Sequence, residues 1–281
     1  DVLIRNGGHG DGDNDGNPDY STIKVLDGGS AGLIHTLQVY GDIHLEDQGQ
    51  LDLVGDDARA ILDVVGKSDN EFSQDGTSAV PYLYRALMNK GTDSTYSFTF
   101  NDDFNLTGST SGSGQEKALE LQNGKLILND PGINIDLTTG DDDFYIPGSA
   151  ALEVRQGKVN ASGNSGILLD DAMEVTGGTV DMSGGDNYIE YSASGNASIG
   201  VSAGQLTVGS QIRRGLTSTE GILDYDQSGG TVVVGQAAAP ENNRGVMEVL
   251  NDGSHFSNTG GHLFIASAQD NPSTTALYFD P

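Results

Sequence analysis

A glycine-centred motif recurs through the second half of the chain without being copied. It reads ALELQNGKLIL at 118–128, ALEVRQGKVNA at 151–161, AMEVTGGTVDM at 172–182 and SIGVSAGQLTV at 198–208. In each copy, apolar residues lie five and three positions before the glycine and two and four positions after it. Alternation with a period of two is what a strand with one buried face requires, and glycine permits a bend with no side chain to clash. Each copy therefore predicts two short strands joined at a corner.

The spacing of the motif predicts a solenoid. Looser versions follow the four copies, so that the anchor glycines are Gly124, Gly157, Gly178, Gly204, Gly230 and Gly261. Successive anchors are separated by roughly 20 to 35 residues, which is typical of solenoid repeats, in which one repeat cannot close a core but a stack can. At roughly 25 residues per coil, the chain would form about eleven coils. We therefore predict an all-β fold, a right-handed parallel β-helix that forms one continuous domain.

Three ranges of this domain differ in regularity. Residues 1–66 combine an Asp-rich loop with alternating apolar segments, which predicts N-terminal β-solenoid coils. In residues 67–117 the pattern breaks, and we expect an irregular insertion. Residues 118–281 carry the motif with Asn, Asp, Gly and Ser between the strands, which predicts regular coils.

Two segments in the first half fit more than one kind of element. The range 78–91 has Pro81 near a first turn, leucines four residues apart and Gly91 at its end, which favours a short helix against the stack. The range 56–65 fits a short helix or a strand, and its β-branched end favours the strand.

The composition suits a narrow interior. The chain has 41 Gly but no Trp and no Cys, and Val, Ile and Leu dominate its apolar residues. These residues fit a ladder in which like side chains stack from coil to coil. The absence of Cys leaves the redox compartment open.

The charge of the chain argues against some partners. The formal net charge is −28, from 41 acidic and 13 basic residues. Such a surface repels phosphate backbones, so we expect no nucleic-acid partner. A solvated acidic surface is the favoured interpretation, beside calcium binding and adaptation to salt. No apolar run approaches the roughly 18 residues of a membrane span, so we predict none.

The sequence GDGDNDGNPD at 10–19 has the alternating carboxylates and central glycine of a calcium loop. The candidate ligands of a structural Ca²⁺ are Asp11, Asp13, Asp15, Asn17 and Asp19. Position twelve is Thr22 and not the bidentate Glu of an EF-hand, so a compact Asp-rich loop is the better match. The alternative is an acidic, flexible turn.

Two clusters could carry chemistry. Asp141, Asp142 and Asp143 could supply the paired carboxylates of a glycosidase, but a solvated corner between coils is the favoured interpretation. Arg213 and Arg214 form an adjacent basic pair that could supply the base of a lyase, but arginines in so acidic a chain more often pair with carboxylates. We therefore predict no catalytic residues and no enzyme activity.

The second half of the chain resembles a group of bacterial surface proteins. The runs SIGVSAGQLTVGSQIRRGLTSTEGILDYDQSGGTVVVG at 198–235 and NNRGVMEVLNDGSHFSNTGGHLFIAS at 242–267 carry the resemblance. They are similar to repeat regions of very large secreted proteins of Gram-negative bacteria, the autotransporter passengers and filamentous-haemagglutinin-like adhesins. The resemblance implies a right-handed β-helix, secretion to the bacterial cell surface and a structural role. It carries over no catalytic residues.

These observations lead to a structural hypothesis. We expect a rigid adhesin stalk, surface-layer component or filament subunit that associates with itself through uncapped coils and has surface glycans as a further candidate partner. One alternative is a polysaccharide-degrading β-helix enzyme, a glycosidase or a lyase. The other is a calcium-dependent glycan-binding module without turnover.

Overall fold

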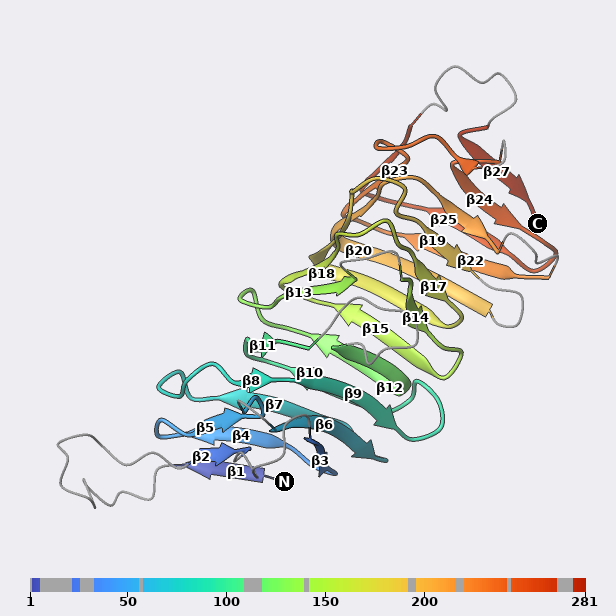
Figure 1. Cartoon of the computed structure of the whole chain (residues 1–281). Coiled ribbons are helices and arrows are strands. Elements are labelled where there is room, and N and C mark those ends of the chain that lie inside the picture. Colours follow the sequence, from blue (N-terminus) through green and yellow to red (C-terminus); the bar gives the residue numbers. More distant parts are fainter. Residues whose placement is uncertain are drawn as a thin grey trace, which may run out of the picture.

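The strands of the chain lie as parallel rungs along one axis (Figure 1). The computed structural model describes residues 2–5, 22–25, 33–55, 58–108, 118–138, 142–191, 196–215, 220–241, 244–266 and 275–281. Within these residues the chain forms strands β1 to β27 and no α-helix. The strands wind into a β-solenoid. The predicted all-β fold of stacked parallel strands is confirmed, and its right hand stays a prediction.

One stack of strands runs from the first described turn to the last, and we call it the long stack. It contains β1 (Val2–Arg5), β4 (Ile43–Glu46), β7 (Asn70–Gln74), β10 (Ser97–Phe100), the second half of β12 (Leu119–Leu128), β15 (Ala150–Val154), the first halves of β18 (Ala172–Met182) and β20 (Asn196–Val208), β22 (Ile222–Gln227) and β25 (His255–Asn258). Each member pairs in parallel with the next one.

Four shorter stacks complete the turns. The β3–β12 stack contains β3 (Leu33–Val39), β6 (Ala58–Gly66), β9 (Arg85–Lys90) and the first half of β12. The β2–β11 stack contains β2 (Thr22–Lys24), β5 (Gln50–Asp52), β8 (Tyr82–Leu83) and β11 (Asn105–Leu106). The β13–β26 stack contains β13 (Asn134–Thr138), β16 (Lys158–Ala161), the second halves of β18 and β20, β23 (Thr231–Val234) and β26 (His262–Ile265). The β14–β27 stack contains β14 (Phe144–Ile146), β17 (Ile167–Leu169), β19 (Ile189–Tyr191), β21 (Ile212–Arg214), β24 (Met247–Leu250) and β27 (Leu277–Asp280).

A seam divides the solenoid into two halves. In the first half each turn passes from the β3–β12 stack through the long stack to the β2–β11 stack. In the second half the β14–β27 and β13–β26 stacks take these places, and the long stack continues without a break. The first half of β12 and β14 therefore occupy the same place in consecutive turns. Within the described residues, no ladder joins these two strands.

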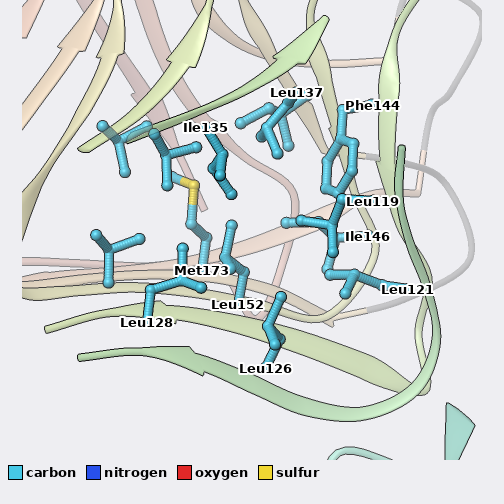
Figure 2. Packing of buried hydrophobic residues seen from close by; sticks show 14 of the residues in the cluster. Leu119, Leu121, Leu126, Leu128, Ile135, Leu137, Phe144, Ile146, Leu152 and Met173 are labelled. Atoms are coloured by element: carbon cyan, nitrogen blue, oxygen red, sulfur yellow. The ribbon is translucent and has the colours of Figure 1, made fainter. Parts of the chain in front are cut away.

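Like side chains stack from turn to turn in the interior (Figure 2). Along the long stack the residues in register are Leu126, Leu152, Met173, Ile199 and Tyr225, each at most 2% exposed. Such alternation between buried and outward positions is what the period of two predicted. Burial of these ladders is the main source of stability in a fold with so thin a core.

Aromatic rings fill the interior of the first half. The ring centroids of Phe72 and Phe100, which lie in consecutive turns, are 5.6 Å apart. Phe104 packs against Phe100 with its centroid at 4.2 Å. Phe98 meets Phe100 edge to face at 5.2 Å. Ring pairs at these separations add to the stabilisation that burial alone provides.

Stacked glycines form the corner between the long stack and the β13–β26 stack. Gly157, Gly178, Gly204, Gly230 and Gly261 occupy this corner in successive turns. Gly204 has a φ of +72°, and a Cβ atom there would lie 2.1 Å from the carbonyl oxygen of Gly178. A Cβ atom on Gly261 would lie 2.4 Å from the carbonyl oxygen of Gly230. The predicted role of these glycines at a bend is confirmed, and the neighbouring turn also leaves no room for a side chain.

The first copy of the motif lies at a different corner. Gly124 joins the first half of β12, in the β3–β12 stack, to its second half in the long stack. As a result Leu126, which follows Gly124, lies opposite Leu152, which precedes Gly157. The wide spacing between these two glycines therefore covers one full turn and one additional strand of the long stack.

The expected helix at 78–91 is wrong, because this range forms strands β8 and β9. In β9 the buried positions alternate, and Ala86 and Met88 lie between rungs of the neighbouring turns. The third inward residue is Lys90, a charged residue where the pattern calls for an apolar one. Its Nζ donates hydrogen bonds to the carbonyl oxygen of Val65 and to Oδ1 of Asn70. Contacts between turns therefore override the local helical signal.

The range 67–117, expected to be an irregular insertion, contributes rungs in its described part. Strands β7 to β11 lie there and pair within the same stacks as their neighbours. The stretch 56–65 lies largely in β6, so the preference for a strand there is confirmed.

The described part of the long stack has ten rungs, fewer than the about eleven coils expected, because several turns are longer than the spacing that the motif suggested. Phe72 lies opposite Phe100 in one turn, and Tyr225 lies opposite Phe256 in a longer one. The first turn is the longest of these, since Ile4 pairs with Leu45. Loops between the rungs account for the difference.

Candidate functional site

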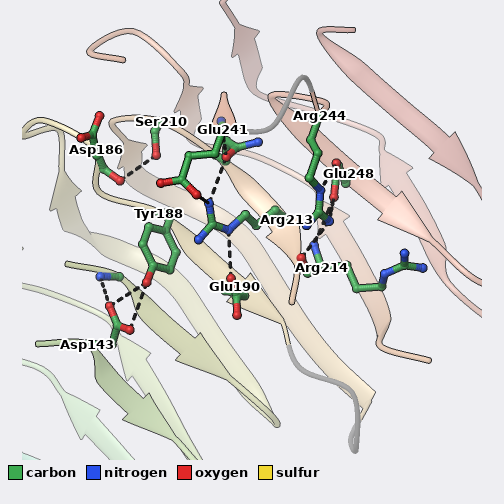
Figure 3. A network of polar contacts seen from close by, with 12 residues as sticks. Asp143, Asp186, Tyr188, Glu190, Ser210, Arg213, Arg214, Glu241, Arg244 and Glu248 are labelled. Carbon is green, nitrogen blue, oxygen red and sulfur yellow. Dashed lines mark hydrogen bonds and ion pairs between the residues drawn. The ribbon is translucent and has the colours of Figure 1, made fainter. Parts of the chain in front are cut away.

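Polar side chains gather on the outer face of the β14–β27 stack (Figure 3). In register along this stack, Tyr145, Leu168, Glu190 and Arg213 follow one another at the middle position of each strand. Because residues on either side of this position point inward, these four point outward. The face combines acids, phenols and guanidinium groups that come from different turns.

Arg213 is buried although its position is an outward one. Its guanidinium forms ion pairs with Glu190 and Glu241, both with N to O distances of 2.9 Å. The ring of Tyr188 covers it, with the ring centroid 4.0 Å from the guanidinium carbon. The interpretation of Arg213 as an ion-pair residue is confirmed. Its burial leaves little of the guanidinium exposed to a substrate, which favours a structural role over that of a lyase base.

Gln211 connects Arg213 to Glu241 and Gly245. This residue has no exposed surface. Its Oε1 accepts hydrogen bonds from Nη1 of Arg213 and from the backbone N–H of Glu241, at 3.1 and 3.0 Å. Its Nε2 donates to the carbonyl oxygen of Gly245 at 2.9 Å. One amide thus links Arg213, Glu241 and Gly245.

Asp143 belongs to the same face. Its Oδ1 accepts a hydrogen bond from the backbone N–H of Gly166 at 2.6 Å, and its two carboxylate oxygens accept from the hydroxyl of Tyr188 at 3.0 Å. Asp141 lies outside the described residues. Because Asp143 is held by two donors, its carboxylate serves as a link between turns.

The tyrosine hydroxyls of this face are weak acids, because their pKa values are raised. Burial, followed by the charge of Asp143, raises the pKa of Tyr188. A hydrogen bond to Asp170, followed by burial, raises the pKa of Tyr145 to about 12. Both hydroxyls therefore stay protonated and donate to carboxylates across the physiological range.

A cavity on the β14–β27 stack is lined by two arginines, and we call it the arginine pocket. It is about 350 Å³ in volume and is lined by Arg214, Arg244, Gly245, Glu248, Leu250, Thr275 and Tyr278. Glu248 is 1% exposed and pairs with Arg244 through both carboxylate oxygens. Backbone N–H groups of Gly245 and Arg214 also donate to Glu248.

An apolar cavity lies at the seam, and we call it the seam groove. It is about 370 Å³ in volume and is lined by Leu119, Glu120, Leu121, Gln122, Asp143, Phe144, Tyr145 and Pro147. Leu119, Leu121 and Phe144 form its buried floor, and the ring of Tyr145 is exposed. The groove arises because β12 and β14 occupy consecutive turns without pairing.

The candidate calcium ligands Asp11, Asp13, Asp15, Asn17 and Asp19 lie outside the described residues, so calcium binding there stays a prediction. Elsewhere in the described part of the chain, no three His, Cys, Asp or Glu side chains gather as metal ligands would. The described residues also include no helix that is long and apolar enough to span a membrane.

Sequence reasoning missed several members of the polar network, namely Tyr188, Gln211, Arg244 and Glu248. The sequence signal that could have found such partners is a separation of about one turn between residues of opposite charge. Glu190 precedes Arg213 by 23 residues and Glu241 follows it by 28. These spacings match the coil length, but the partners become visible only once the register of the turns is known.

Comparison of the chain with protein-family models, with curated proteins and with solved structures gives no match. The similarity to adhesin repeat regions therefore stays a prediction from the sequence.

Proposed function

We propose that the chain is a rigid structural rod, a spacer or stalk of an extracellular bacterial surface protein. One observation carries the proposal: polar side chains along the sides of the solenoid bind the neighbouring turn. Charged and amide groups that could serve a substrate are used instead to hold consecutive rungs together.

Amide side chains form the clearest of these axial links. Nδ2 of Asn129 donates to Oδ1 of Asn101 at 2.8 Å, and Nδ2 of Asn101 donates to Glu71 at 2.7 Å. These residues are 28 and 30 apart and thus lie in consecutive turns. In the second half, Asn160 donates in the same way to Asn134 at 2.9 Å. Each such bond contributes on the order of 1 kcal/mol, and together they resist shear between turns.

The continuity of the long stack supports the same function. Its parallel ladder crosses the seam, where both lateral stacks change over. Backbone hydrogen bonds therefore run through the molecule along one face. A rod of this kind transmits force between its ends without a hinge at the seam.

Pulsed electron spin resonance between spin labels on early and late turns tests the rigidity of the rod. The labels are attached to Thr36→Cys and His262→Cys, two exposed positions in a chain without native cysteine. We expect a single narrow distance distribution, because the long stack crosses the seam without a break. A broad or bimodal distribution would contradict the proposal.

We also propose that two copies of the chain associate end to end. The inward residues Phe256, Leu263, Ile265 and Leu277, on the last described turn, are only partly buried. A rung of a second copy in register would extend their ladders and cover them. Sedimentation velocity is expected to show oligomers whose size grows with concentration, which Leu263→Asp abolishes and the outward Phe264→Asp preserves. A monomer at every concentration would contradict this part of the proposal.

A further inference from the structure

We infer that the arginine pocket binds a uronic acid residue, a sugar that carries a carboxylate. The inference is independent of the proposed rod function, since it rests on one cavity of the β14–β27 stack. Its elements are a guanidinium that has no carboxylate partner among the described residues, an exposed tyrosine ring and the lining residue Thr275.

The charges that line the pocket do not cancel. Its ionisable side chains are Arg214, Arg244 and Glu248, besides the phenol of Tyr278. Glu248 is neutralised by Arg244, which binds both of its oxygens, and two backbone N–H groups complete its acceptors. One positive charge, that of Arg214, is left over in the pocket of a chain whose net charge is −28.

Arg214 differs from its two neighbours in its partners. Arg213 and Arg244 form ion pairs, whereas no carboxylate of the described residues lies within 4.0 Å of the Arg214 guanidinium. Its Nη1 donates to Oδ1 of Asn251 at 2.6 Å. Its Nε is buried and has no hydrogen-bond partner in the described structure.

A buried donor without a hydrogen-bond partner is costly, and a ligand that accepts its hydrogen bond removes the cost. Because Asn251 uses Nη1, the guanidinium edge formed by Nε and Nη2 is the one left for a ligand. This edge presents two parallel N–H groups, which match the two oxygens of a carboxylate. In the proposed complex the Arg214 side chain turns so that Nε, which is buried in the structure, donates to the ligand.

The remaining wall of the pocket favours a sugar over a bare anion. The ring of Tyr278 is 46% exposed, and an aromatic face of this kind packs against the C–H face of a pyranose. The hydroxyl of Thr275 can exchange hydrogen bonds with sugar hydroxyls. At about 350 Å³, the cavity lies at the lower end of the range for small-molecule sites, which suits one sugar residue of a longer glycan.

Isothermal titration calorimetry with trigalacturonate tests the inference on the whole chain. We expect saturable binding of the free acid and none of the fully methyl-esterified trimer, which lacks the charge. Arg214→Gln is expected to weaken binding at least tenfold. Arg214→Lys keeps the positive charge but lacks the two parallel N–H groups. It is expected to weaken binding less than Arg214→Gln does. The matched control is Arg155→Gln, on the long stack next to Glu153, and it is expected to bind like the unmodified chain.

Several outcomes would overturn the inference. Absence of binding by the unmodified chain would do so, as would equal affinity of the Arg214→Gln variant with an unchanged melting temperature. Should Arg214→Gln fail to fold, Tyr278→Ala takes its place, because it removes only the stacking surface and is expected to weaken binding. Equal binding of triglutamate would overturn the assignment to a sugar, since a peptide carboxylate offers no pyranose face.

Discussion

At the scale of single residues, the glycine column shows how a repeated sequence position becomes a geometric requirement. Gly204 combines a positive φ with a carbonyl oxygen of the next turn where its Cβ atom would lie. A side chain there is strained by the backbone conformation and blocked by the neighbouring turn at the same time. Gly200, on the adjacent half of β20, has neither constraint, because a Cβ atom would meet only Glu174 Cγ at 3.7 Å.

We therefore predict that Gly204→Ala lowers the free energy of unfolding by at least about 2 kcal/mol. Gly200→Ala, as the matched control, is expected to change it by less than about 1 kcal/mol in either direction. Urea denaturation followed by circular dichroism measures both values. Equal effects of the two substitutions would refute the role assigned to the column.

Arg213 provides a second prediction at this scale. Its replacement by Gln leaves Glu190, Glu241 and the buried Gln211 without their common donor. Breaking a buried pair costs about 3 kcal/mol, because an uncompensated charge remains. The more exposed pair of Lys158 with Asp181 is the comparison, and Lys158→Gln should cost no more than about 1 kcal/mol. Thermal unfolding of both variants tests this prediction. An unchanged melting temperature of Arg213→Gln would contradict the burial of this network.

At the scale of strands, the period of two and the glycine spacing were sufficient to predict parallel rungs, but not to predict which stack each rung joins. The copy around Gly124 matches the other copies residue by residue and yet lies one corner earlier. A periodic pattern defines inside and outside along a strand, and it carries no information on the face of the solenoid. Strand β9 was missed for another reason, since an inward Lys90 interrupts the apolar alternation.

Links between strands of consecutive turns also predict a pH dependence. The carboxylate of Asp75, just after β7, accepts a hydrogen bond from the backbone N–H of Asp47 in the preceding turn and from Thr77. These bonds, with that from Asp47 the strongest, hold the pKa of Asp75 well below its usual value of 3.8. A depressed pKa stabilises the fold fully above the unfolded value, and the contribution is lost as the pH falls through the folded value.

We accordingly expect Asp75→Asn to be less stable than the unmodified chain at neutral pH. The difference should shrink steadily below pH 3.8, where the unfolded carboxyl takes up its proton, and vanish in strong acid. Melting temperatures measured across this range test the prediction. A difference that is independent of pH would show that the carboxylate charge is not what links the turns.

At the scale of the whole molecule, the sequence predicted the architecture and three residues of the candidate site, Asp143, Arg213 and Arg214. The pair of Arg213 and Arg214 drew attention as the only adjacent basic residues, and the structure separates their roles. Tyr188 could not be predicted, because its partners lie in other turns. Arg244 and Glu248 pair four residues apart, but their contacts with Arg214 depend on the register of the neighbouring turn. The seam groove was equally invisible, since it results from the changeover of whole stacks.

The predicted calcium loop also belongs to this scale, because a bound ion would tie down one end of the first turns. If Asp11, Asp13 and Asp15 hold Ca²⁺, removal of the ion by a chelator should lower the melting temperature, and added Ca²⁺ should restore it. Asp13→Asn is expected to make the melting temperature insensitive to the chelator. An unmodified chain that melts at the same temperature with and without chelator would exclude a structural calcium ion.

Pairwise disulfide formation tests the stacking of turns most directly, because the chain has no cysteine of its own. Thr207 and Val233 point outward from consecutive turns in direct register, whereas Thr231 lies opposite Gln205. We predict that the pair Thr207→Cys and Val233→Cys oxidises readily within the native molecule, and that Thr207→Cys with Thr231→Cys does not. Efficient cross-linking of the second pair, or none of the first, would contradict the register on which the solenoid depends.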